Sequence, residues 1–425
     1  MAGKGLFRRM LGLCGILLAG IAVGFALLTA VFLLPVDAME EHVLASIPAL
    51  SGEWGTGEES YEQVLKGYAS TQLDNSTDAY MLLSAIHRSD KSAVDQAVNV
   101  YTWQDPDSFG QYGTLLRYGK SGSEGMQEKA TARYWLGYLV VLKPLLLFLN
   151  YMDIRMLNMI VQLGLVMLLC CLMQKRGLGR YVLPFGLSLL CITPGVTWLS
   201  LQFSTTLLVA LAAMAALLWK PQRMKTPMAE DVFFLLTGMA TSYFDFLTYP
   251  IATLGLPLAA RMALRQKQEK PCGLADFVKI CLSWGIGYAG MWSGKWLMAA
   301  LLTGQNVFAE AGSAMGNRLG AVDDSGVELA LTTGVQENLR IMFNPLTVLM
   351  LLGVLAVCAL LWLRVGGRPD VKRLGTYLLC ALLPIAWYMA LLNHSAEHAF
   401  FTYRALCVTI FAAVSMAIPT GKAET

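Results

Sequence analysis

The sequence predicts an all-α polytopic membrane protein with about ten transmembrane helices, one interfacial or re-entrant segment and a mainly helical first loop outside the cytoplasm. Hydrophobic residues make up 56% of the 425 positions and charged residues only 14%, whereas about a quarter of a soluble domain is charged. Apolar runs long enough to cross a bilayer recur along most of the chain. Between them lie short basic stretches, which are typical of cytoplasmic loops.

The first element, residues 1–34, is predicted to be a retained signal anchor. Lys4, Arg8 and Arg9 precede an apolar run over residues 10–34, and this run is too long for the core of a cleaved signal peptide. The nine cysteines lie almost entirely in apolar segments, without a second pair at metal-ligand spacing. We therefore expect no disulfide framework, no metal and no cofactor.

Residues 35–133 are polar and hold much of the acidic content, without a run able to span a membrane. The basic N-terminus places this loop outside the cytoplasm. Residues 134–155 are apolar but are interrupted by Lys143 and Pro144. They are predicted to form an interfacial or re-entrant segment and not a simple crossing.

Residues 156–425 are predicted to form the multi-span membrane domain. Nine further spans are expected at 156–173, 181–199, 203–219, 231–249, 250–263, 274–302, 342–363, 375–392 and 405–418. Four basic clusters, at 175–180, 220–225, 261–270 and 364–373, then face the cytoplasm. The expected localisation is the cell membrane, with both termini cytoplasmic.

Two outward carboxylates are spaced four residues apart, at Asp74 and Asp78, with amide and hydroxyl groups between them. Asp74 could cap a helix over residues 76–86, or act as a general base, and the two roles are compatible. Asp37 is a further outward carboxylate, close after the first span. In isolation, such a residue is more often an ordinary polar residue of the interface.

Arg133, Tyr134 and Trp135 lie at the membrane edge, a short distance before Lys143. One interpretation is an aromatic belt with a lysine that extends to the headgroups. The other is that the two cations bind the phosphate of a lipid-linked substrate.

Further candidates lie near the outer ends of later spans. Asp245 has an aromatic setting, and Lys295 is a possible counter-ion for it, in a structural ion pair or in a substrate site. His394 and His398 have the spacing of half a metal site, but the HExxH pattern is absent. Arg404 is the better candidate for holding a phosphate or diphosphate.

The signal anchor, large acidic first loop, amphipathic return segment and many further spans together resemble the GT-C superfamily of membrane glycosyltransferases. Segments 74–82, 133–138, 245–250 and 398–404 resemble bacterial relatives associated with surface-polysaccharide modification. The chain lacks the WWD-type motif and the large C-terminal soluble domain of the oligosaccharyltransferase branch.

This resemblance implies transfer of a sugar from a polyprenyl-phosphate carrier to a cell-surface glycan or lipid acceptor on the outer face. The expected partners are the polyprenyl-phosphate-linked sugar, that acceptor and membrane lipids, with no nucleic acid. The carboxylate base would come from the first outer loop, and cations would offset charge on the leaving phosphate. Candidates for the base are Asp37, Asp74 and Asp78, and candidates for the cations are Arg133, Lys143, Lys295 and Arg404.

We expect Asp74, Asp78, Arg133 and Arg404 to converge on one outward cavity, because a base and phosphate-binding cations must reach the same substrate. The alternative is a transporter or flippase of a lipid-linked saccharide, in which the same charges would line a path.

Overall fold

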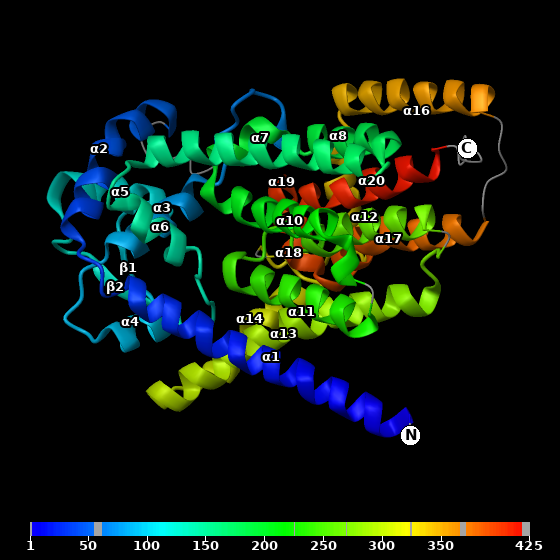
Figure 1. Cartoon of the computed structure of the whole chain (residues 1–425). Helices are drawn as coiled ribbons and strands as arrows, with labels where there is room; N and C mark the ends of the chain where they lie inside the picture. The colour runs from blue at the N-terminus through cyan, green and yellow to red at the C-terminus, as the bar shows by residue number, and fades with distance from the viewer. Residues whose placement is uncertain are drawn as a thin grey trace.

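The computed structural model describes residues 2–54, 62–224, 226–268, 270–323, 325–365 and 371–418. The chain is mostly helical (Figure 1). Long helices lie side by side through most of the molecule, and short elements gather at one end. The helix α1 (Ala2–Val31) crosses α11 and α13 along the outside of the long helices.

The short elements between residues 37 and 130 form what we call the small domain. Its elements are α2 (Asp37–Trp54), η1 (Ala69–Thr71), α3 (Asn75–Ile86), α4 (Ala93–Asn99), β1 (Tyr101–Gln104), α5 (Gly110–Ser121) and β2 (Gln127–Ala130). The two strands pair antiparallel, with Tyr101 opposite Ala130. The sequence prediction of a mainly helical loop did not anticipate this β-ribbon.

The remaining elements are the long helices and the shorter segments that connect them. They are α6 (Leu139–Leu146), α7 (Tyr151–Lys175), η2 (Gly179–Tyr181), α8 (Val182–Leu190), α9 (Pro194–Leu199), α10 (Leu201–Trp219), η3 (Pro221–Met224), α11 (Pro227–Phe244), α12 (Ile251–Lys267), α13 (Leu274–Thr303), α14 (Val307–Leu319), α15 (Thr333–Met342), α16 (Pro345–Val365), α17 (Val371–Ala390), α18 (Leu392–Glu397), α19 (Ala399–Thr402), η4 (Tyr403–Leu406) and α20 (Cys407–Met416).

Several helices are long and apolar enough to cross a membrane. Among the described residues, the four that qualify are Phe7–Val31, Tyr151–Lys175, Leu201–Trp219 and Ala399–Met416. A fifth would be the pair Thr333–Met342 and Pro345–Leu361, which is bent by 76°. These helices are consistent with an all-α membrane protein, while the count of ten crossings stays a prediction.

Two predicted segments depart from straight spans. Residues 181–199 were expected to form one helix, but the chain breaks between α8 and α9, where Thr193 adopts a left-handed φ of 57° and Pro194 begins α9. A left-handed residue ends a right-handed helix, and a proline cannot continue one. In the other segment, α6 has only 8 residues. It is too short to span a bilayer. The sequence prediction was that this segment does not make a simple crossing.

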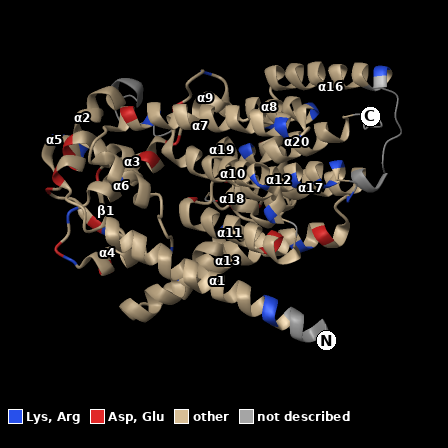
Figure 2. Ribbon diagram, viewed as in Figure 1, with Lys and Arg blue, Asp and Glu red and all other residues tan. Residues whose placement is uncertain are grey.

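Charges are distributed unevenly between the two ends of the molecule (Figure 2). Acidic side chains are frequent in the small domain, and Lys and Arg gather at the opposite end of the long helices. The start of α1 and the end of α20 both lie towards that basic end (Figure 1).

Candidate functional site

Asp78 joins the small domain to the long helices. Its side chain is buried, with the residue 2% exposed, and accepts hydrogen bonds from Tyr151 Oη at 2.5 Å, Leu201 N at 2.8 Å, Gln202 N at 3.0 Å and Ser200 Oγ at 3.1 Å. The two backbone donors belong to the first turn of α10, where N–H groups lack partners within the helix and favour a negative charge. These contacts indicate that Asp78 anchors the small domain to the long helices.

Lys143 and Lys295 place positive charges at the C-terminal ends of two small-domain helices. The Nζ of Lys143 donates to Ala85 O at 2.7 Å, at the end of α3. The Nζ of Lys295 donates to Ala97 O at 3.0 Å and Val98 O at 2.7 Å, at the end of α4. Both lysines are buried, and cations are stabilising at these carbonyl ends. The ammonium group of Lys143 is therefore bound inside the protein.

These contacts predict that Lys295→Met weakens the docking of the small domain. A hydrogen bond to a charged group contributes about 1.5–3 kcal/mol, and Lys295 makes two of them. We expect a loss of roughly 2–3 kcal/mol and faster proteolysis within the small domain, measured on detergent-solubilised protein. The control is Lys129→Met, which removes an exposed lysine on β2. Equal melting of the two variants would refute this role.

Asp245 lies at the start of the loop between α11 and α12, residues 245–250. Its Oδ1 accepts from Thr206 Oγ1 and Thr248 Oγ1, each at 2.6 Å. The expected pairing with Lys295 is therefore wrong, because Lys295 binds carbonyls of α4 instead. Hydroxyl donors suffice to stabilise this buried carboxylate without a cation.

The same loop contacts the predicted aromatic segment. The ring of Tyr134 stacks on Phe246, with centroids 4.8 Å apart, and meets Trp292 edge-on at 5.4 Å. The indole of Trp135 donates to Met291 O at 2.7 Å. Both aromatic residues thus fasten the 134–138 segment to α13 and to the loop.

Arg133 and the two predicted histidines contact side chains of α14. Arg133 forms an ion pair of 2.9 Å with Glu310. Arg318 lies 3.1 Å from His394 Nδ1 and 2.7 Å from His398 Nε2. Since arginine only donates, both ring nitrogens accept, and the two histidines bind a guanidinium in this structure. The part of the chain that the structure describes holds no group of three or more His, Cys, Asp or Glu suited to a metal.

Asp74 caps α3, as one of the two sequence interpretations required. It accepts from Thr77 N at 2.9 Å and Thr77 Oγ1 at 2.8 Å, and the residue is 4% exposed. The pKa of Asp74 is raised from 3.8 to about 6, mainly by burial; the nearby Asp78 adds to the rise and the Thr77 hydrogen bonds oppose it. A carboxyl group with a pKa near neutrality is suited to accepting a proton.

Arg404 reaches the segment that leads into Asp74. It is fully buried, stacks on the Phe203 ring at 4.1 Å, and donates to Phe400 O at 3.0 Å and Ser70 O at 3.3 Å. Its Nε has no hydrogen-bond partner among the described residues. A buried cation with an unused donor is available to an incoming anion.

The expected convergence is therefore only partly seen. Asp74, Asp78 and Arg404 all lie around the first turn of α10, whose residues Gln202 and Phe203 they contact. Arg133 instead pairs with α14. Asp37 lies apart from both of these groups, at the start of α2. Its side chain is 83% exposed and lies 2.6 Å from Arg88.

An apolar groove of about 470 Å³ lies between α6, α7 and α10. Most of its lining is aliphatic, with Val141, Leu145, Val161 and Leu208 among the contributors. Met81 of α3 also lines it. Because Asp74, Asp78 and Met81 are spaced four and three residues apart, they share one face of α3.

Sequence reasoning missed Arg318, Glu310 and Gln202. Each contacts a partner more than seventy residues away, which spacing along the chain does not reveal. Comparisons with protein-family models, with curated proteins and with solved structures found no match to this chain.

Proposed function

We propose that the chain is a membrane glycosyltransferase that moves a sugar from a polyprenyl-phosphate carrier to a cell-surface glycan or lipid acceptor, with Asp74 as the base. The observation that supports this most directly is the face of α3 that joins a buried carboxyl group to a lipid-sized groove. From Asp74 to Met81 this face extends only ~10 Å, at 1.5 Å per residue. A sugar phosphate could bridge that distance while its lipid chain occupies the groove.

The groove suits a polyprenyl chain because its walls are mainly aliphatic. Tyr138, Asn158 and Ser204 supply a small number of polar atoms among these apolar neighbours. Cavities of this kind bind apolar ligands through buried area and orient them through a few polar groups. The location between α6, α7 and α10 favours entry from the lipid side.

The proposed reaction divides between Asp74 and Arg404. The acceptor hydroxyl attacks the anomeric carbon, its proton passes to Asp74, and the bond from that carbon to the phosphate oxygen breaks. The electron pair leaves with polyprenyl phosphate, whose charge Arg404 offsets from the Ser70 side. The small domain lies outside the cytoplasm in this proposal, because the basic end of the molecule lies opposite it (Figure 2).

The test uses purified full-length protein with radiolabelled polyprenyl-phosphate sugars of long and short chain. Leu208→Trp should fill the groove and reduce transfer from long-chain donors at least tenfold, with a smaller effect on short-chain donors. The matched control is Leu163→Trp, which changes an exposed apolar residue on α7 outside the groove lining.

Two outcomes would overturn the proposal. One is wild-type protein that transfers sugar from none of the donors. The other is labelled donor that crosses the bilayer of a vesicle with its sugar still attached, which would indicate a flippase.

A further inference from the structure

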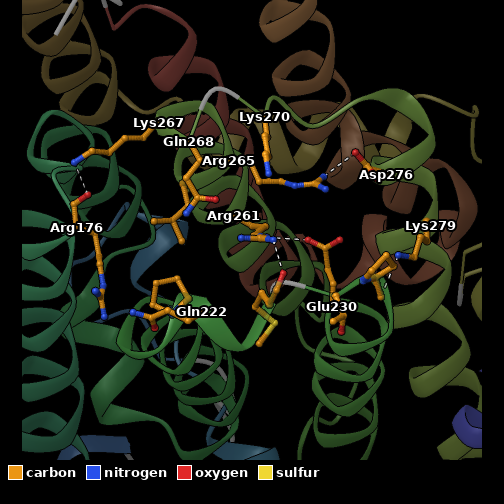
Figure 3. A pocket seen from close by; sticks show the side chains of 15 residues that line it. Arg176, Gln222, Glu230, Arg261, Arg265, Lys267, Gln268, Lys270, Asp276 and Lys279 are labelled. Carbon is orange, nitrogen blue, oxygen red and sulfur yellow. Dashed lines mark hydrogen bonds and ion pairs between the residues drawn. The ribbon is translucent and has the colours of Figure 1, made fainter.

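A second cavity, of about 760 Å³, lies at the basic end of the long helices, and Figure 3 shows the side chains that line it. Its walls come from the end of α7, from η3, from the start of α11, from the end of α12, from the segment that follows α12, and from the start of α13. Six cations line it against two carboxylates, an excess of four positive charges among the described lining residues. The cations are Arg176, Arg261, Arg265, Lys267, Lys270 and Lys279, and the carboxylates are Glu230 and Asp276.

Three of the cations form ion pairs with carboxylates of the protein. Arg261 is buried and donates to Glu230 Oε1 at 2.8 Å. Arg265 lies 2.8 Å from Asp276. Lys279 lies 2.9 Å from Asp231, just outside the lining.

The other three cations contact no carboxylate among the described residues. Arg176 donates from Nε to Leu218 O at 2.8 Å, and Lys267 donates to Arg176 O at 3.0 Å, so both contact neutral carbonyls. Lys270 is exposed, and no carboxylate contacts it within the part of the chain that the structure describes. Figure 3 shows Arg176 and Lys267 together on one side of the cavity, with Lys270 at its upper edge.

We propose that this cavity binds a phosphate-bearing group through Arg176, Lys267 and Lys270. Like charges gathered around one cavity repel each other, and an anion between them relieves that repulsion. Phosphate oxygens are strong acceptors for Arg and Lys donors. The volume exceeds that of one phosphate, so a diphosphate or the headgroup of an anionic lipid fits.

The two possible sources of the phosphate share this chemistry and separate by experiment. A lipid headgroup would enter from the leaflet at this end, where basic pockets between helices bind anionic headgroups. A free diphosphate would enter from water. The site is independent of the transfer reaction proposed above, because it lies at the other end of the long helices.

The experiment places the full chain in nanodiscs of phosphatidylcholine, with or without cardiolipin, and adds inorganic pyrophosphate to the discs that lack cardiolipin. Binding is followed by the shift in melting temperature and by native mass spectrometry. We expect at least one probe to bind and to stabilise the wild type. The double variant Lys267→Gln and Lys270→Gln should weaken that binding at least tenfold.

The matched control neutralises Lys175 and Lys220, two exposed lysines at the same end that do not line the cavity. It should change the affinity less than twofold. Lys270→Glu alone provides a second test, because that side chain is exposed and contacts no carboxylate among the described residues, so its charge reversal should leave folding intact.

Binding of cardiolipin alone assigns the lipid source, and binding of pyrophosphate alone assigns a free diphosphate. Failure of both probes to bind the wild type would overturn the proposal. Equal weakening by the lining and control variants would also overturn it, since that result indicates only a general attraction to a basic surface.

Discussion

Asp78→Ala is expected to detach the small domain from the long helices, with a loss of about 3–5 kcal/mol in the free energy of unfolding. The carboxylate accepts four hydrogen bonds, including two from backbone N–H groups at the start of α10. Each buried donor left without its acceptor costs about 1–3 kcal/mol, and local relaxation recovers part of the sum. Unfolding in detergent, with limited proteolysis of the small domain, measures the effect.

Two further variants make this expectation specific. Asp78→Asn should be intermediate in stability, because its amide retains one acceptor oxygen but turns a donor towards other donors. Asp90→Ala removes an exposed carboxylate of the same domain and should be near neutral. If Asp78→Ala melts like the wild type but has lost sugar transfer, Asp78 is the base and its anchoring role is wrong.

The sequence predicted the helical class and the residues that carry charge at the membrane edge, but not their partners. Lys143 and Lys295 could be recognised as costly intramembrane charges. Their actual acceptors, the last carbonyls of α3 and α4, depend on how the small domain packs. Periodicity along one chain carries no information about such long-range contacts, so a structural role and a phosphate-binding role looked alike.

The carboxylate pair illustrates the same limit. Spacing alone placed Asp74 and Asp78 on one face of a helix, and the structure confirms the cap formed by Asp74. Only the packing shows that Asp78 accepts four hydrogen bonds from Tyr151 of α7 and from the start of α10, whereas Asp74 accepts the two hydrogen bonds of its cap and a contact from Gln202. This difference in available acceptor capacity is the reason for proposing Asp74, and not Asp78, as the base.

The pKa of Asp74, raised by burial to about 6, leads to opposite expectations for stability and activity. Because the folded state holds this proton more tightly than the unfolded state does, the stabilisation is complete below about pH 4 and is lost as the pH rises through about 6. The loss amounts to roughly 2–3 kcal/mol, at about 1.4 kcal/mol per pKa unit. Asp74→Asn should therefore melt higher than the wild type above pH 6, since asparagine also caps helices well.

Transfer should depend on pH in the reverse direction, because the proposed base must be ionised. The wild-type rate should rise from pH 5 to 7 with a midpoint near 6, and Asp74→Asn should lower it ~10²–10⁴-fold, the usual contribution of a general base. Rates at saturating donor, measured beside the melting curves at each pH, test both halves together. A carboxyl group that serves only as a cap would give the stability change with an unaltered rate, whereas a catalytic base couples greater stability to lost transfer.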